Sequence, residues 1–510
     1  MLLKSALLPV LLLLGALQRI EAEPRPDFAI KATISGTGNV VKNSGKVSAS
    51  FDLVDNLNLT LTSGYNLLND MKAAVLYIGS NVTAAGMTFT TALNTLAADR
   101  SNNVNGTFAP VYQAITAMRT LLQTGFTDQF AALSKQGPFI TKQFNDAFRS
   151  ILDRLTLFTG ALDRMKTGVT SARDAAGNPP NGISSDNLAR YVPLKLSIDL
   201  QDALSRLNAD IPLVTYIVEE TQRRLSTADT FVDQMRTEGH TMVNDAKSSK
   251  DVLLSDVDTI STNVMDAVDN RVVPVYNEQV AALATVQTAL QAITTYGDDL
   301  QPALDSLAAV LDANGTSALT ADIDARFTAY QTGVNASVAN SSSVEQFMVG
   351  ETCVGLRSVV EALVASSPYS KFCYSKFSPQ IFNQFALSYY TVSECYDFEV
   401  FRLYQLQDLM SLVVTMIIYD VEDLGAAITI CAPLTDGAPC LTMIGPYYET
   451  LATTIGQKQA YILSFIQEET KFSLQRLSSC VVAAKYTTII SVAATVSNLN
   501  SCILTGPVAV

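Results

Sequence analysis

The stretch LQDALSRLNADIPLVTYIVEETQRRLSTADTFVDQMRTEGHTMVNDA, residues 200 to 246, carries an apolar or small side chain at every third or fourth position. The spacing averages about 3.5 residues, which is the period of helices that pack as coiled coils. It predicts a long helix that buries this stripe, and it indicates an all-α fold of elongated helical bundles or coiled-coil hairpins. The stripe consists of Leu200, Leu204, Leu207, Ile211, Val214, Val218, Thr221, Leu225, Ala228, Val232, Met235, Gly239, Met242 and Ala246.

Prolines mark where such helices are expected to break. Pro212 follows Asp210 inside the stripe, which predicts a kink or a new helix with Asp210 as its N-cap. Pro274 and Pro302 are further candidate breaks around a later stripe from Leu283 to Leu311. An earlier stripe, from Phe130 to Val169, predicts another long helix.

Composition divides the chain into regions. The stretch GNPPNG, residues 177 to 182, predicts a linker because proline cannot donate a backbone hydrogen bond and glycine permits turns. We expect helical hairpins on each side of it, with a homo-oligomeric coiled coil as the alternative, and an exposed, partly flexible stretch over 313–343. The expected regions are a signal peptide at 1–22, an irregular lead-in at 23–57, a first helical region at 58–176, the linker at 177–187, a second helical or coiled-coil region at 188–345, and a disulfide-linked helical C-terminal domain at 346–510.

The first residues, MLLKSALLPVLLLLGALQRIEA, combine an early lysine, a short apolar run and a small residue at Ala22. This pattern is typical of a secretory signal peptide, so we expect a secreted, extracellular protein. The formal net charge of −14 gives no electrostatic footprint for nucleic acid. The best later membrane candidate, Leu409 to Ile418, is followed at once by acidic residues, so no membrane span is expected.

Asparagines in N-x-S/T sequons are consistent with a glycoprotein of the secretory pathway. All of them lie before every cysteine of the chain. The glycosylation candidates are Asn58, Asn81, Asn105, Asn314, Asn335 and Asn340.

The chain has seven cysteines, and an oxidising export route makes disulfides the expected state. Because seven is odd, at least one thiol is free or pairs between chains. In ICAPLTDGAPC, residues 430 to 440, the two cysteines fasten a turn either to each other or to the neighbouring helices, and the sequence leaves both alternatives open. The disulfide candidates are Cys353, Cys373, Cys395, Cys431, Cys440, Cys480 and Cys502.

The residues that common enzymes need are scarce. His240 is the single histidine, which excludes a histidine-based triad or a multi-histidine zinc site within one chain. Carboxylate pairs such as Asp298 and Asp299 are typical of solvated helix faces. We therefore expect no enzyme, and no catalytic, cofactor-binding or metal-ligating residue.

Aromatic side chains become frequent after Tyr369, and their helical spacing favours core packing over a ligand cavity. In the same region ETCVGLR, KFCYSKF and SECYDF space their cysteines about twenty residues apart, ICAPLTDGAPC holds a pair, and SSCVVAAKYTTIISVAATVSNLNSCILTG closes the pattern. This arrangement resembles the TsetseEP-type domain of secreted fly and mosquito proteins. The resemblance implies a secreted insect protein, often of gut or haemolymph, and it supplies no catalytic residue.

These observations predict a secreted, glycosylated, non-enzymatic helical protein that acts by interaction. Its partners would be other copies of itself, an extracellular protein or matrix, or a microbial surface. The alternative is an extracellular carrier of an apolar small ligand, held in the aromatic-rich C-terminal helical domain.

Overall fold

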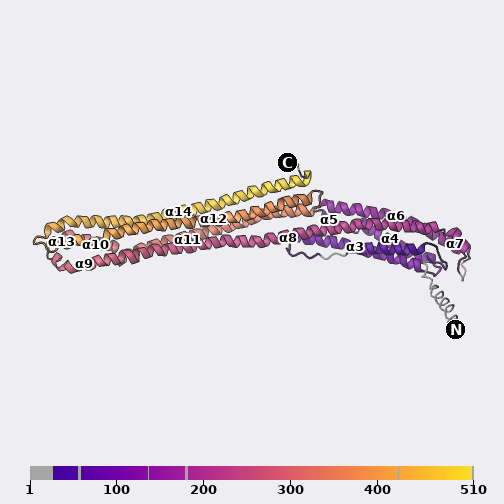
Figure 1. Ribbon diagram of the computed structural model, residues 1–510, viewed down its shortest axis with the longest axis horizontal. Coiled ribbons are helices and arrows are strands. Elements are labelled where there is room, and N and C mark those ends of the chain that lie inside the picture. Colours follow the sequence, from indigo (N-terminus) through magenta and orange to yellow (C-terminus); the bar gives the residue numbers. More distant parts are fainter. Residues whose placement is uncertain (1–26, 56–58, 136, 178–181, 423, 508–510) are drawn as a thin grey trace, which may run out of the picture. The chain divides into compact units, whose positions relative to one another are not determined.

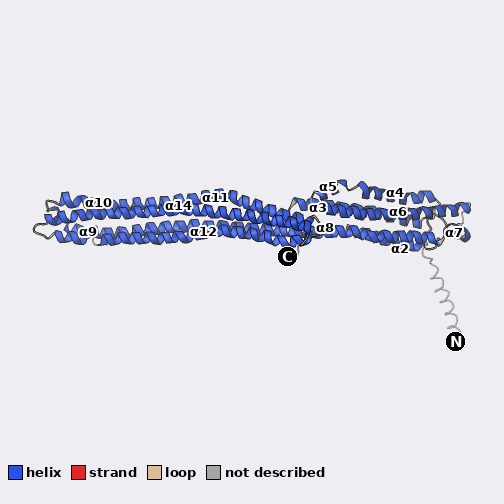
Figure 2. Cartoon of the chain, turned by 90° about the horizontal axis from the view of Figure 1, so that it is seen from above, coloured by secondary structure: helices blue, strands red, loops and turns tan. Residues whose placement is uncertain are grey.

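The computed structural model describes residues 27–55, 59–135, 137–177, 182–422 and 424–507, and these residues form helices without a strand (Figure 2). This confirms the predicted all-α class. The expected signal peptide lies outside the described residues. The chain forms two compact units, one made of residues 1–234, 358–376 and 499–510, and the other of residues 235–357 and 377–498.

Unit 1 is a bundle built mainly from the N-terminal half of the chain. Its cores lie between helices that follow one another in sequence, and α3 packs against α2, α4 and α5. The helices are α2 (Thr37–Asp52), α3 (Asn66–Ala98), α4 (Val104–Thr124), α5 (Thr127–Ser134), α6 (Pro138–Ala175), α7 (Ser185–Tyr191) and the first part of α8 (Leu194–Ala267) (Figure 1).

Phenylalanines fill much of the core of unit 1. Phe126, Phe144 and Phe148 are nearly inaccessible to solvent, and the ring of Phe148 contacts the rings of both Phe126 and Phe144. Phe89 of α3 meets Phe158 of α6 edge to face at 5.2 Å between ring centroids. Aromatic pairs of this geometry stabilise a core beyond the burial of their area.

The structure corrects two expectations for this unit. Residues 37–52, expected to be irregular, form α2, whose Phe51 is buried against Gly86 of α3. Helix α8 continues through Pro212, and Asp210 is no N-cap, because its carboxylate accepts hydrogen bonds from Ser150 and Arg154 of α6. Burial of Ile211 and Val214 on both sides of Pro212 offsets the cost of about 3 kcal/mol for a proline inside a helix.

Two further boundaries differ. The stripe from Phe130 to Val169 is split between α5 and α6, and Gly137 at the break lies against the backbone of Ala365. Helices α6 and α8, on opposite sides of the expected linker, belong to one unit and pair antiparallel through the ion pairs Arg154–Asp210 at 2.8 Å and Arg164–Asp199 at 3.2 Å. The hairpins therefore do not separate at residues 177–182.

Unit 2 consists of two helical hairpins. The first hairpin runs from α8 through η2 (Val268–Val272) and α9 (Val273–Gln291) to its tip, and returns through η3 (Tyr296–Leu300), α10 (Gln301–Leu311) and α11 (Ala313–Val364). The second runs through α12 (Ser370–Glu422) and α13 (Leu424–Cys431), turns, and returns through α14 (Ala438–Thr505). One continuous apolar core contains residues from all of these helices.

The two hairpins of unit 2 lie side by side in the same orientation. The hydrogen bonds Asn263–Gln407, Thr295–Ala438 and Tyr330–Ser473 join residues 144, 143 and 143 positions apart. A nearly constant separation means that each helical arm of one hairpin runs parallel to the corresponding arm of the other. The second hairpin thus repeats the path of the first.

Expectations for this unit have mixed outcomes. Pro274 and Pro302 are the second residues of α9 and α10, and the π-helical turns η2 and η3 end two residues before them, so regular α-helix is interrupted beside both predicted breaks. Residues 313–335 were expected to be exposed, but this part of α11 buries Leu319, Ile323 and Phe327. Residues 346–510 form no separate domain, because α12 and α14 share their cores with α8 to α11.

We predict that Asp229→Asn loosens residues 59–65 of unit 1. The Asp229 side chain is buried and accepts hydrogen bonds from the backbone N–H groups of Thr62 (2.8 Å) and Ser63 (3.0 Å) and from both hydroxyls. The cost should be about 1 to 3 kcal/mol at pH 7, visible as faster hydrogen exchange at Thr62 and Ser63, whereas exposed Asp202→Asn should leave these amides unchanged.

The effect should depend on pH. Burial alone would raise the pKa of Asp229, but the hydrogen bonds from Ser63 and Thr62 outweigh it and lower the pKa below its ordinary value of about 3.9. The stabilisation is therefore fully present above pH about 4 and is lost as the pH falls through the lowered pKa. A difference between wild type and Asp229→Asn that persisted well below that pKa would contradict this account.

Candidate functional site

Six of the seven cysteines form disulfides. Cys373 pairs with Cys502, Cys395 with Cys480, and Cys431 with Cys440, at Cα separations of 5.9, 5.9 and 5.7 Å. The pair in ICAPLTDGAPC therefore closes its own turn between α13 and α14. Three disulfides indicate an oxidising compartment such as the extracellular space.

Cys353 of α11 is the remaining, free cysteine and its residue is exposed. Partial burial of the sulfur raises the pKa of the thiol, so it is a weak nucleophile at neutral pH.

The other residues considered from sequence do not converge on a reaction centre. His240 is exposed on α8, and Asp299 accepts a hydrogen bond from Thr442 in a helix contact. Within the described part of the chain, no group of three His, Cys, Asp or Glu side chains is placed to hold a metal ion. The expectations that the protein is no enzyme and needs no cofactor stay predictions.

The sequons that the structure describes lie on helices. Asn105, Asn314 and Asn335 are exposed, while Asn81 is half-buried and donates a hydrogen bond to the carbonyl of Tyr77. Asn58 and the side chain of Asn340 lie outside the described part. Helices α12 to α14 contain no sequon.

The aromatic region after Tyr369 has two faces. Phe385, Tyr389 and Tyr396 are buried, as core packing predicts, but many neighbours point to solvent. On α12 the exposed apolar residues recur every three or four positions from Leu387 to Tyr419, interrupted at Glu394 and Gln405. This outer stripe consists of Leu387, Tyr390, Phe398, Phe401, Leu409, Leu412, Met416 and Tyr419, with exposures from 41% to 65%.

Helix α14 carries a second series of exposed apolar residues in unit 2. It consists of Met443, Tyr447, Tyr461, Phe465, Phe472, Val482, Tyr486 and Ile490. Phe398 of α12 and Phe472 of α14 line one open groove of about 530 Å³ beside the Cys395–Cys480 disulfide. The two series therefore open to the same side at this level, and we call them together the outer face.

A buried ion pair forms the base of this groove. Glu399 is 1% exposed and accepts two hydrogen bonds from Arg476, at 2.9 and 2.7 Å, and one from Arg402. Burial would raise the pKa of Glu399, but Arg476, Ser473 and Arg402 lower it. The carboxylate is therefore ionised, and its charge is paired with that of Arg476. The groove offers aromatic walls without an unpaired charge.

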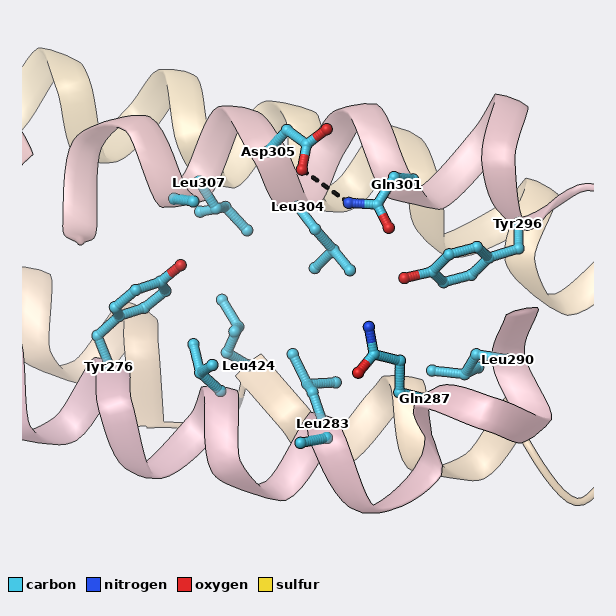
Figure 3. Close-up of a pocket in the computed structure, with 13 residues that line it drawn as sticks. Tyr276, Leu283, Gln287, Leu290, Tyr296, Gln301, Leu304, Asp305, Leu307 and Leu424 are labelled. Atoms are coloured by element: carbon cyan, nitrogen blue, oxygen red, sulfur yellow. Dashed lines mark hydrogen bonds between the residues drawn. The ribbon is translucent and has the colours of Figure 1, made fainter.

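A separate pocket lies near the tip of the first hairpin, between α9 and η3–α10 (Figure 3). It has a volume of about 220 Å³, apolar walls from Leu283, Leu290 and Leu304, and a floor from Leu424 of α13. The hydroxyls of Tyr276 and Tyr296 point into it from opposite ends. We call it the tyrosine pocket; its remaining lining residues are Val280, Ala284, Gln287, Gln301, Asp305, Leu307 and Ala308.

The sequence did not predict the outer face or the tyrosine pocket, for identifiable reasons. Helical spacing shows that aromatic residues share a face, but it does not show whether that face is buried. The tyrosine pocket lies outside the aromatic-rich region in which a cavity was considered. Repeated aromatic positions on two opposite faces of α12 were the available signal.

Comparison with known proteins identifies no relative of this chain. No protein-family model, no curated protein and no solved structure matches this chain. The resemblance to the TsetseEP-type domain therefore stays a prediction, and the site rests on its own geometry.

Helix α14 also contains a stretch apolar enough to cross a membrane, by length and composition alone, and 28% of that stretch is buried. This stretch differs from Leu409 to Ile418 of α12, which is the best candidate by inspection of the sequence. Such a helix is weak evidence, because core helices of soluble proteins have the same composition. That the protein has no membrane span stays a prediction.

We predict that the disulfide of unit 2 that encloses the longer stretch of chain stabilises it more, because loop-closure entropy grows with the logarithm of loop length. The pairs Cys395–Cys480 and Cys431–Cys440 join residues 85 and 9 positions apart. Loop-closure entropy gives about 4 to 5 kcal/mol for the first pair and about 2 to 3 kcal/mol for the second. Paired Cys→Ala variants followed by urea denaturation and circular dichroism should show this order.

Cys353→Ala provides the matched control, since it removes a thiol that closes no loop. Its denaturation midpoint should equal that of the wild type. A larger loss from the Cys431–Cys440 pair than from the Cys395–Cys480 pair would refute the entropic account.

Proposed function

We propose that the protein is a secreted, glycosylated interaction protein that binds a macromolecular partner through the outer face of α12 and α14. The observation that supports this proposal is the run of exposed aromatic and aliphatic side chains along α12, including Phe398 at 60% and Phe401 at 65%. Monomeric soluble proteins rarely expose contiguous apolar surface on this scale unless it binds something. Aromatic side chains are also enriched in the buried centres of protein interfaces.

The distribution of sequons supports the same surface. Asn314 and Asn335 lie on α11 of the first hairpin, whereas the second hairpin has none. Glycans would therefore be carried on the first hairpin and leave the aromatic stripe uncovered. The neutralised Glu399–Arg476 pair keeps the groove beside Phe398 free of unpaired charge, which suits an apolar contact.

The function needs no reaction centre. The partner classes to be tested are a second copy of the chain, an extracellular matrix and a microbial surface. Membership of the TsetseEP-type family and an insect origin are part of the same proposal and rest on the cysteine pattern alone.

We predict that Phe401→Gln, Leu412→Gln and Tyr419→Gln together abolish binding. These side chains are 65%, 58% and 65% exposed, so their replacement should leave the thermal midpoint unchanged while removing apolar contact area. Sedimentation velocity over a concentration series measures self-association. Co-sedimentation measures binding to insoluble matrix polysaccharide and to bacterial cells.

The matched control replaces Ile198, Leu213 and Tyr216 of α8 by Gln, at exposures of 50%, 48% and 59%. This control should bind as the wild type does. The proposal fails if the wild type binds none of the three partner classes, or if both triple variants bind equally well.

A further inference from the structure

Two tyrosine hydroxyls face the space of the tyrosine pocket without a hydrogen-bond partner among the described residues. Tyr276 is 7% exposed and Tyr296 is 8% exposed, yet neither hydroxyl makes a hydrogen bond within the described residues. Both hydroxyl oxygens are accessible from the open space of the pocket, so a ligand bound there can replace the water that they contact. Two other buried tyrosines of this unit are hydrogen-bonded: Tyr330 bonds to Ser473 at 2.7 Å, and Tyr448 donates to the carbonyl of Leu424.

The position of the hydroxyls sets the shape of a ligand. Figure 3 shows them at opposite ends of the pocket, with Leu283 and Leu304 between them. A matching molecule has an apolar middle and a polar group at each end. The volume of about 220 Å³ lies below the range of about 300 to 1,000 Å³ that is usual for drug-sized ligands, so the molecule is small.

The charges of the pocket select the kind of polar group. Asp305 is its one ionisable acid and accepts a 2.7 Å hydrogen bond from the neutral amide of Gln301, while no lysine or arginine lines the pocket. Burial raises the pKa of both tyrosines. The negative charges of Asp312 and Asp305 raise the pKa of Tyr276 further, and the charge of Asp305 does the same for Tyr296, so both hydroxyls stay neutral. The site favours a cation over an anion.

An ammonium group suits the end of the pocket near Tyr296. Its N–H groups can donate to the carboxylate of Asp305, whose negative charge also acts on the Tyr296 hydroxyl, and aromatic rings attract cations further. The Tyr276 hydroxyl at the far end can exchange a hydrogen bond with a neutral hydroxyl. Leucine side chains from α9 and α10 enclose the apolar part between them.

We propose that the tyrosine pocket binds a small hydroxyaryl-alkylamine, with its ammonium group at Asp305 and Tyr296 and its hydroxyl at Tyr276. The site is independent of the outer face, because none of its lining residues belongs to the outer stripe of α12 or the series on α14.

The test uses the full secreted chain with its disulfides intact and three probes. They are 4-(2-aminoethyl)phenol, 2-phenylethylamine, which lacks the hydroxyl, and 3-(4-hydroxyphenyl)propanoate, which replaces the amine by an acid. Ligand-observed NMR titration at low ionic strength measures each affinity. We expect the first probe to bind most tightly and the acid most weakly.

The variants assign each end of the probe. Tyr276→Phe should weaken 4-(2-aminoethyl)phenol to the affinity of 2-phenylethylamine while leaving the latter unchanged. Asp305→Asn should weaken both amines about threefold to fivefold, as expected for a partly exposed ion pair, and Leu304→Trp should abolish binding by filling the pocket.

Tyr419→Phe and Asp322→Asn change an exposed tyrosine and an exposed aspartate elsewhere in unit 2 and serve as matched controls. Both should bind as the wild type does. Failure of all probes to bind the wild type, equal affinity for the acid and the amine, or unchanged binding to folded Leu304→Trp would each overturn the proposal. Retained amine binding in the outer-face triple variant would show that the two sites are separate.

Discussion

The register between α12 and α14 is the constraint on which the rest of unit 2 depends. The Cys395–Cys480 disulfide fixes one level, and one turn further along α12 Glu399 receives two hydrogen bonds from Arg476. A shift of α14 by one residue would rotate its side chains by about 100° and leave the Glu399 carboxylate buried without its partner, which costs about 3 to 5 kcal/mol. Because this register is fixed, Phe398 and Phe472 open into the same groove.

A second constraint follows from the parallel placement of the two hairpins. Contacts between them keep a separation of 143 to 146 residues from Thr295–Ala438 to Gln279–Gly425, so the tips of both hairpins lie together. Leu424, near the tip of the second hairpin, therefore reaches the floor of a pocket whose walls belong to the first. The tyrosine pocket is a product of this alignment, because neither hairpin supplies the whole lining alone.

The sequence predicted what depends on local periodicity and missed what depends on packing. The stripe from Leu200 to Ala246 and the breaks at Pro274 and Pro302 are read directly from spacing and proline chemistry. Helix α2 was missed because Gly, Ser and Asn favour turns over helix, whereas contacts such as Asn43 with Ser205 of α8 hold it in place. The meeting of Tyr276 and Tyr296 in one pocket could not be predicted from spacing, since a π-helical turn precedes Tyr276 and another begins at Tyr296, and such turns shift the helical register.

Two features of the chain oppose aggregation through its exposed aromatic residues: its net charge and the placement of these residues. A formal net charge of −14 opposes unspecific association of whole molecules, while the outer stripe on α12 keeps its apolar residues together on one side of one helix. Scattering these residues around α12 would lower local hydrophobicity but give no partner a continuous surface. Concentrating them next to a disulfide and a buried ion pair gives a rigid surface, and a rigid surface loses little conformational entropy when it binds.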